Sequence, residues 1–472
     1  MIFLALLFAI SYPAHASVIT VTNTNDGGPG SLRQALVDAN DGDTIEFAVT
    51  GTIGLTTGEL LVNNSITISG PGAENLAVNG NVKSTVFHVA PGETVTISGL
   101  TITNGSAGSG GGVHNEHAAL TLNNCTVTGN QGGGIYNDAE NIGHATLEIN
   151  NSLITNNSGG GIYNDAIQAG TATLVITYST LSNNNNGDAI NNHGWSCLFC
   201  GNGTTEVQII NSSITNNPGN AIYSDTGRLN CGGECPITVS ITNSTISGNG
   251  GGVYNSTLSD TVVSNSTISD NGTGISNYSP LGSSVFNSTM SNNGVEIRNS
   301  AGSGSLATMG NTIFKVSPGG HSIVSDSGTV TSYGYNLSSD DGGGYLNGPG
   351  DQINTDPLLG PLQGNGGPTF THALLPGSPA INAGDPNFTP PPLYDQRGPG
   401  FDRVRSGRLD VGSFEVQATP TPTPTATATA TATLTPTATA TPTATPTTTA
   451  RPTPTARPNV TPRTRPTPPP RP

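Results

Sequence analysis

The chain has 472 residues, of which only 9% are charged, and its formal net charge is −16. All 30 acidic residues and 9 of the 14 basic residues lie before residue 418. Such an acidic body argues against a nucleic-acid partner, which needs a clustered basic face. It leaves cations, cationic surfaces and neutral glycans as candidate ligands.

Residues 1–16 have the pattern of a secretory signal peptide. Residues 2–10 form an apolar run that is far too short to cross a bilayer, and Ala14-His15-Ala16 is a cleavage site of the small-x-small type. The basic residues that usually precede the apolar run are missing. We expect an exported protein without a transmembrane segment in its mature chain, because no other stretch is long and apolar enough.

Residues 17–44 are predicted to form an N-terminal cap with one short helix. Ser31 follows a Gly-rich turn and can cap the helix start, and the pattern ends at the Asn-Asp-Gly of residues 40–42. The apolar positions share one helical face: Leu32, Ala35, Leu36 and Ala39. We expect this helix to cover the first coil of a solenoid, whose open end exposes unpaired backbone groups.

Residues 45–353 are built from a repeat, most clearly seen in residues 151–165 as Asn-Ser-Leu-Ile-Thr-Asn-Asn-Ser-Gly-Gly-Gly-Ile-Tyr-Asn-Asp. Close copies begin at Asn124, Tyr178, Asn211, Asn243, Asn265 and Asn287, at intervals of 22 to 33 residues. The shortest copy holds three β-rich runs, around Ile268, Ile275 and Val285, with polar turns between them. This pattern predicts a mainly β fold, a single-stranded parallel β-helix of about ten coils stacked about 4.8 Å apart.

Two features of the repeat have structural explanations. The Gly triplets 132–134, 159–161 and 250–252 suit sharp corners at positive φ. A phosphate-binding loop is disfavoured, because it should lead into a helix. An Asn after the middle run predicts a column of stacked amides along the axis. This Asn recurs as Asn115, Asn137, Asn164, Asn192, Asn255, Asn277 and Asn299.

These segments resemble exported bacterial right-handed parallel β-helix proteins of the pectin-lyase-like superfamily. The stretch 22–35 is similar to their N-terminal cap, and the Gly-Gly-Gly-Ile-Tyr-Asn corners are similar to those of surface members such as chlamydial polymorphic outer-membrane proteins. Residues 354–417 resemble the C-terminal domain termed choice-of-anchor Q, through the segments 356–360, 374–380, 395–398 and 410–415. The resemblance implies a right-handed coil, export and surface display, and does not by itself imply an enzyme.

The end of the chain has two further features. The C-terminal domain mixes four arginines with four acids, which predicts a salt-bridged cap over the last coil: Arg397, Arg403, Arg405 and Arg408 with Asp395, Asp402, Asp410 and Glu415. Residues 418–472 consist mainly of Thr, Pro and Ala and hold 15 of the 34 prolines. They have no apolar face, so we expect a disordered tail, without a recognisable anchor.

A polysaccharide lyase, the activity of many superfamily members, needs carboxylates that hold Ca²⁺ and a basic residue that takes the α-proton of a uronate. The basic residues between positions 18 and 350 fall in different repeats, without an adjacent carboxylate cluster: Arg33, Lys83, Arg228, Arg298 and Lys315. We therefore assign no catalytic residue.

Superposed repeats give a candidate metal site and a candidate ligand site. Glu116, Asp138 and Asp165 share one position in successive coils, followed by His193 and Asp225. Their repulsion could be relieved by bound Ca²⁺, or by solvent alone. Two positions earlier lie Tyr136, Tyr163, Tyr223 and Tyr254, with His114 one coil before. These rings point outward and form either a platform for sugars or a stack that stabilises the solenoid.

Five cysteines complete the candidate residues. Cys197 and Cys200 lie in one long repeat, and Cys231 and Cys235 lie in the next. Export favours two disulfides, and the spacing also suits Zn²⁺. Cys125 takes a position that is Ser in other repeats, so we expect a buried free thiol.

The leading hypothesis is an exported, monomeric surface or secreted protein without catalytic activity. It would bind or adhere to glycans or to another cell-surface partner along its acidic and aromatic faces. The alternative is a lyase or glycoside hydrolase that acts on acidic polysaccharide, and the second alternative is a purely structural stalk.

Overall fold

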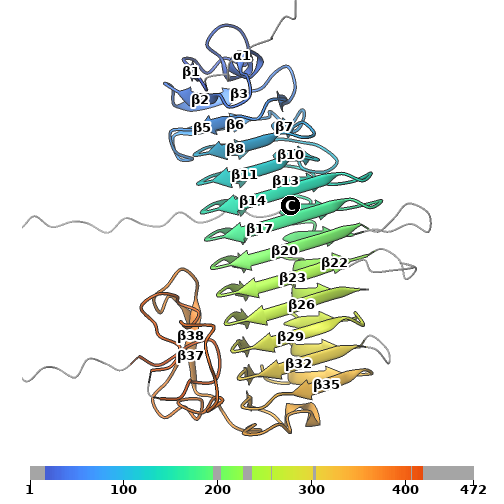
Figure 1. Cartoon of the computed structure of the whole chain (residues 1–472), viewed down its shortest axis with the longest axis vertical. Helices are drawn as coiled ribbons and strands as arrows, with labels where there is room; N and C mark the ends of the chain where they lie inside the picture. The colour runs from blue at the N-terminus through green and yellow to red at the C-terminus, as the bar shows by residue number, and fades with distance from the viewer. Residues whose placement is uncertain are drawn as a thin grey trace, which may run out of the picture. The chain divides into compact units, whose positions relative to one another are not determined.

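The computed structural model describes residues 16–194, 203–226, 237–256, 258–300, 305–405 and 407–417. All of them belong to the first of two compact units, which ends at Thr419. In this unit three parallel sheets run along one solenoid (Figure 1). The mainly β parallel β-helix is confirmed, with sheets of 13, 12 and 11 strands in the described residues, against about ten coils expected.

Each sheet takes one strand from successive coils. Sheet 1 contains β1 (Val18–Val21), β2 (Thr44–Phe47), β5 (Thr67–Ser69), β8 (Thr94–Ser98), β11 (Ala119–Asn123), β14 (His144–Asn150), β17 (Thr171–Thr177), β20 (Thr204–Ile210), β23 (Ile237–Thr242), β26 (Ser259–Ser264), β29 (Gly282–Phe286), β32 (Leu306–Gly310) and β35 (Thr329–Ser332). Sheet 2 contains β3 (Gly51–Gly54), β6 (Leu76–Asn79), β9 (Thr101–Thr103), β12 (Thr126–Thr128), β15 (Leu153–Thr155), β18 (Thr180–Ser182), β21 (Ser213–Thr215), β24 (Thr245–Ser247), β27 (Thr267–Ser269), β30 (Thr289–Ser291), β33 (Ile313–Lys315) and β36 (Leu337–Ser338). Sheet 3 contains β4 (Leu60–Val62), β7 (Phe87–Val89), β10 (Val113–Glu116), β13 (Ile135–Asp138), β16 (Ile162–Asp165), β19 (Ile190–His193), β22 (Asn220–Asp225), β25 (Gly251–Asn255), β28 (Ile275–Asn277), β31 (Val295–Asn299) and β34 (His321–Ser325).

Successive strands are in register, so one repeat position recurs from coil to coil. In sheet 3, Ile135 pairs with Ile162 and Ile162 pairs with Ile190, and all three side chains are fully buried. Because side chains alternate between the two faces of a strand, the inward Ile, Val and Leu form one continuous core. Burying each such side chain contributes about 1.5–3 kcal/mol. The outward positions are left available for function.

The repeats begin at a corner between sheet 1 and sheet 2. Their seven starting residues, six Asn and Tyr178, all have φ between 48° and 53°, a region that Asn tolerates better than most residues. Gly132, Gly133, Gly159 and Gly160 have positive φ as predicted, but the triplet 250–252 does not. A Cβ on Gly250 would lie 2.0 Å from the carbonyl oxygen of Pro218, so close backbone packing explains this triplet instead.

The amide column predicted along the axis is confirmed for Asn115 to Asn192 and for Asn277 with Asn299, whereas Ser224 takes this position between Asn192 and Asn255. Asn115 donates from Nδ2 to Asn137 Oδ1 (2.7 Å), Asn137 donates to Asn164 (2.7 Å), and Asn164 donates to Asn192 (2.9 Å). A second column, which we did not predict, follows another corner through Asn130, Asn157, Asn184, Asn217, Asn249, Asn271 and Asn293. It ends on the buried carboxyl group of Glu296, whose pKa is raised by burial.

The N-terminal helix has the start predicted for it. The helix α1 (Leu32–Asp38) begins after Ser31, whose Oγ accepts a hydrogen bond from the backbone N–H of Gln34 (3.2 Å). Leu32 and Leu36 are buried in the core of the solenoid, and α1 contacts β1 and β4. The helix therefore covers the apolar end of the first coils, as expected.

The C-terminal domain, which contains the antiparallel pair β37 (Leu359–Gln363) and β38 (Thr371–Leu374), does not cover the last coil. It packs along sheet 2, where Gln396 Nε2 donates to Thr245 Oγ1 (3.0 Å) and Ser413 N donates to Thr289 Oγ1 (3.0 Å). These outward threonines are 1% exposed, because a row of small hydroxyl side chains offers a flat surface for docking. The last coil is covered instead by η2 (Gly342–Gly344), which contacts β34, and by Leu346, which joins the core.

The predicted salt-bridged cluster of this domain is only partly correct. In the described residues Arg397 pairs with Asp395 (2.5 Å) and Arg405 pairs with Asp402 (3.0 Å). The other two arginines donate to backbone carbonyls instead. Arg403 binds Gly412 O (2.5 Å), and Arg408 binds Ala383 O (2.9 Å). Buried carbonyl groups compete with carboxylates for these donors, and charge patterning in a sequence does not reveal that competition.

Candidate functional site

The outer face of sheet 3 carries two parallel columns of side chains. The ring column consists of His88, His114, Tyr136, Tyr163, Tyr223 and Tyr254, with Asn191 between Tyr163 and Tyr223. The carboxylate column lies two residues further along each strand and consists of Glu116, Asp138, Asp165, His193 and Asp225. Neighbours within each column are paired in register, so the shared positions inferred from the repeats are confirmed.

Five of the six rings in the ring column stack, in one group from His88 to Tyr136 and in a second of Tyr223 with Tyr254. The ring centroids of His88 and His114 are 4.6 Å apart, and those of His114 and Tyr136 are 5.1 Å apart. Tyr223 and Tyr254 stack at 5.1 Å with an interplanar angle of 13°. A ring stacked along the axis turns its face to the next coil and its polar edge to solvent. The geometry matches the expected stack that stabilises the solenoid and not a platform of exposed aromatic faces, and the ring edges carry hydroxyl groups and ring nitrogens.

His88 connects three successive coils through its two ring nitrogens. Nδ1 lies 3.0 Å from Glu59 Oε1, and Nε2 lies 2.8 Å from Glu116 Oε2. Because an ionised carboxylate only accepts, both nitrogens must carry a proton for both contacts to be hydrogen bonds. Burial alone would lower the pKa of His88, but the two carboxylates outweigh it and raise the pKa. The structure thus favours an imidazolium held between two carboxylates.

Histidines on neighbouring coils also face the other predicted metal ligands. His114 Nε2 lies 3.1 Å from Asp138 Oδ2, and His193 Nδ1 lies 3.5 Å from Asp165 Oδ1. The neighbouring carboxylate of Asp165 raises the pKa of His193. In the part of the chain that the structure describes, no three His, Cys, Asp or Glu side chains are grouped so that they could hold a metal ion.

Glu116, Asp138 and Asp165 are therefore not brought together as Ca²⁺ ligands. Each of these carboxylates faces a histidine of a neighbouring coil, so the acids are not packed only against one another. His88 and Glu59 belong to the repeats with the least regular spacing, which is why sequence superposition missed them. The signal that could have found them is the apolar run around Phe87, which places His88 one coil before His114.

The ring column lies in a region of negative potential. Burial, followed by the charges of Asp165 and Asp138, raises the pKa of Tyr136. Burial and the charge of Asp225 raise the pKa of Tyr223 to about 12. The hydroxyl group of Tyr136 donates to Glu140 Oε1 (2.8 Å). Such a face repels polyanions and favours ligands that bring hydrogen-bond donors or positive charge.

The histidine bridge predicts a pH-dependent stability. Since folding raises the pKa of His88, its ion pairs stabilise the first coils fully below the usual His pKa and are lost as the pH rises through the folded pKa. We expect wild type to melt at a higher temperature than His88→Gln at about pH 6, with the difference shrinking by about pH 9. Thermal unfolding at several pH values measures this, and His321→Gln, at an exposed position, is the control. A difference that stays constant with pH would contradict the bridge.

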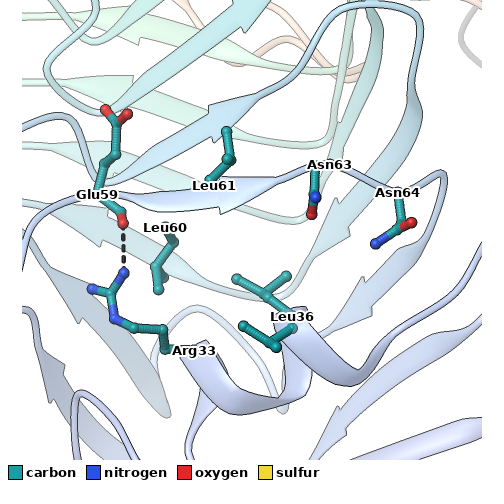
Figure 2. A pocket seen from close by; sticks show the side chains of 8 residues that line it. Arg33, Leu36, Glu59, Leu60, Leu61, Asn63 and Asn64 are labelled. Atoms are coloured by element: carbon teal, nitrogen blue, oxygen red, sulfur yellow. Dashed lines mark hydrogen bonds between the residues drawn. The ribbon is translucent and has the colours of Figure 1, made fainter.

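A hollow of about 340 Å³ lies between α1 and β4, at the N-terminal end of sheet 3 (Figure 2). Its lining comes from α1 and from the segment around β4: Arg33, Leu36, Val37, Glu59, Leu60, Leu61, Asn63 and Asn64. Leu61 pairs in register with His88, so the hollow lies at the end of the ring column. No sequence pattern predicts this hollow, because it depends on how the helix packs against the first strand of sheet 3.

The cysteine predictions fall into two groups. Cys197, Cys200, Cys231 and Cys235 lie outside the described residues, so the choice between disulfides and Zn²⁺ stays a prediction. Cys125 is a buried free thiol, as expected, and burial raises its pKa to about 11. Its N–H donates to Ser152 Oγ (3.0 Å), and Ser152 N–H donates to Ser179 Oγ (3.0 Å), so Cys125 begins a column of serines.

Comparison with solved structures identifies the fold. Pectate lyase Pel9A is similar at 16% sequence identity and a TM-score of 0.50, over 84% of this chain and 96% of that chain. The PL6 family alginate lyase AlyGC has 14% identity and a TM-score of 0.42, over 75% of this chain and 55% of that chain. The chain has the right-handed parallel β-helix of the pectin-lyase-like fold.

The comparisons show no more than this fold. No protein-family model matches the sequence, and no curated protein matches it. Among the described residues, none of the helices has the length and apolar character needed to cross a membrane.

Proposed function

We propose that this protein is exported and binds, without catalysis, a neutral or amino-bearing glycan along the outer face of sheet 3. The observation that carries the proposal is the pair of in-register columns on this face. Hydroxyl, imidazole and carboxylate groups recur there at the coil spacing of about 4.8 Å. A regular array of polar groups on a rigid surface suits an extended polymer whose own hydroxyl groups repeat.

Charge supports the choice of ligand class. The carboxylates of the face give a negative potential where the ligand would lie: burial raises the pKa of Tyr136 first, and the charges of Asp165 and Asp138 raise it further. A polyuronate would be repelled there unless cations neutralised it, whereas an ammonium group or a neutral hydroxyl would be attracted. We propose that the protein acts as a monomer outside the cell, and that the aromatic rings contribute their polar edges.

A binding and cleavage panel tests this proposal against the alternatives. Chitosan, a neutral β-glucan, polygalacturonate and alginate are titrated calorimetrically, and the two uronate polymers are also assayed for unsaturated ends. Binding to chitosan or to the glucan, with none to the uronates, is the expected result. Release of unsaturated ends would establish the lyase alternative, for which fold similarity to pectate lyase Pel9A is the only support. Absence of all binding would leave a structural stalk.

Replacing both Tyr223 and Tyr254 by Phe is the sharpest test of the surface. The double variant keeps the stacked rings and removes only their hydroxyl groups, so it should fold normally. Loss of two hydrogen bonds to the glycan should weaken binding by roughly fivefold to fiftyfold. Tyr333→Phe is the matched control, because Tyr333 follows β35 of sheet 1 and is 63% exposed. Equal affinity of the double variant and the control would exclude this face.

A further inference from the structure

The hollow between α1 and β4 contains a strand edge that no other strand covers. β4 is the terminal strand of sheet 3 and pairs only with β7 in the described residues. Leu60 N–H and Val62 C=O are used in that pairing. In a parallel ladder the neighbouring residue points its backbone groups the other way, so the N–H and C=O of Leu61 face α1. They supply a donor and an acceptor to the hollow.

The edge is closed at both ends. At one end Arg33 donates from Nη1 to Glu59 O (2.6 Å) and from Nη2 to Gly58 O (2.8 Å), and it pairs with Asp26 (2.7 Å). At the other end Asn64 Nδ2 donates to Ala39 O (3.1 Å). The open edge between them is three residues long, or about 10 Å. This length suits one or two sugar rings.

The lining has the mixed character that a sugar ring requires. Val37 and Leu61 are 73% and 48% exposed and offer apolar surface to the C–H face of a pyranose. Asn63 is exposed at the rim, and in Figure 2 the side chains of Asn63 and Asn64 point from β4 toward α1. A volume of about 340 Å³ lies within the range of small-ligand pockets.

We infer that this hollow is the subsite for the terminal sugar of the glycan that lies along the ring column. The inference rests on the proposed function. It follows from continuity, because Leu61 of the hollow precedes His88, His114 and Tyr136 in one in-register column. The helix α1 lies across the end of that column, so the polymer stops there. The protein therefore recognises one end of the glycan chain as well as its length.

The test uses β-1,4-linked hexamers of glucosamine and of glucose, each free or carrying a bulky dye at one or the other end. Val37→Trp fills the hollow from an exposed position, so the fold should be unaffected, and Val18→Trp, at a 60% exposed valine of β1 in sheet 1, is the control for the added indole. We expect Val37→Trp to weaken binding of the free hexamer roughly tenfold. In the wild type a dye at one end only should cause a similar loss, and in Val37→Trp the dye should cause no further loss. Asn63→Ala, which truncates an exposed side chain, should weaken binding in the same direction.

Two failures are distinguishable. If the wild type binds the hexamers but tolerates a dye at either end, and Val37→Trp and Asn63→Ala bind within twofold of wild type, the hollow is not a subsite and the proposed surface stands. If the wild type binds neither the hexamers nor the polymers of the panel, the proposed function falls and this inference falls with it.

Discussion

Replacing Asn184 by alanine is expected to lower the free energy of unfolding by about 3–5 kcal/mol. Asn184 is fully buried, and its Oδ1 accepts from the N–H and from Nδ2 of Asn157 (3.2 and 3.0 Å). Its Nδ2 donates to Ile154 O (3.0 Å) and to Asn217 Oδ1 (3.1 Å). Alanine leaves these groups without partners inside the solenoid, where water cannot replace the lost hydrogen bonds.

The neighbouring residue supplies the control. Asn185 lies in the same corner but is exposed, so Asn185→Ala should change stability by less than about 0.5 kcal/mol. Urea denaturation of both variants measures the difference, and amide exchange in β15, β18 and β21 shows whether the damage is centred on the ladder. Equal stability of the two variants would mean that the amide column contributes little to the fold.

The corner that contains Asn184 and Asn185 also shows how far the inward or outward orientation of a side chain can be predicted from the sequence. The Asn-Asn pairs at 156–157, 183–184 and 216–217 are visible in the sequence, and each marks a corner. In all three pairs the first Asn has φ between 55° and 58° and the second is fully buried. Two identical side chains in succession give no indication of which one turns inward. The second amide column was therefore missed, whereas the first, in which Asn recurs two residues after the buried Ile or Val of the middle run, was predicted.

In the candidate site, too, the sequence predicts which residues lie in one column but not the direction in which their side chains point. The spacing of the repeats placed Glu116, Asp138 and Asp165 in one column and the tyrosines in another, because a solenoid converts sequence period into stacking. The spacing could not show that the rings turn their faces to each other, since this depends on side-chain torsions. It also could not show that histidines from adjacent coils face the carboxylates. With these contacts the face carries stacked rings and hydrogen-bonding groups on an acidic surface, and it does not form a platform of exposed aromatic faces.

The docking of the C-terminal domain on sheet 2 could not be predicted from the sequence. The strands β24, β27 and β30 repeat a Thr-x-Ser pattern that differs little from the patterns in β12 and β18. Only the structure shows that these rows are covered, with Thr267 Oγ1 donating to Gln396 Oε1 (2.6 Å). This docking leaves sheet 3 open in the described residues. The domain therefore stabilises one face of the solenoid while the proposed binding surface lies on another.

Replacing Arg397 by alanine is expected to destabilise the C-terminal domain by about 3–5 kcal/mol, because it leaves the fully buried Asp395 without its cationic partner. Arg397 also lies between two rings, 3.9 Å from the centroid of Phe401 and 3.7 Å from that of Phe414, and it donates to Glu415 O (2.5 Å). Lysine should not restore stability, since it has neither the planar fork nor the stacking surface of arginine.

Amide exchange separates the outcomes of this substitution. In Arg397→Ala the amides of β37 and β38 and of the docked strands β24, β27 and β30 should exchange faster, while those of β10, β13 and β16 should not change. Arg405→Ala is the matched control, because Arg405 and Asp402 are 45% and 53% exposed and such a pair contributes about 1 kcal/mol or less. If both variants exchange alike, the buried pair does not hold the domain on sheet 2. If Arg397→Ala still binds glycan while the amides of the C-terminal domain exchange faster, the binding surface on sheet 3 does not depend on the domain docked on sheet 2.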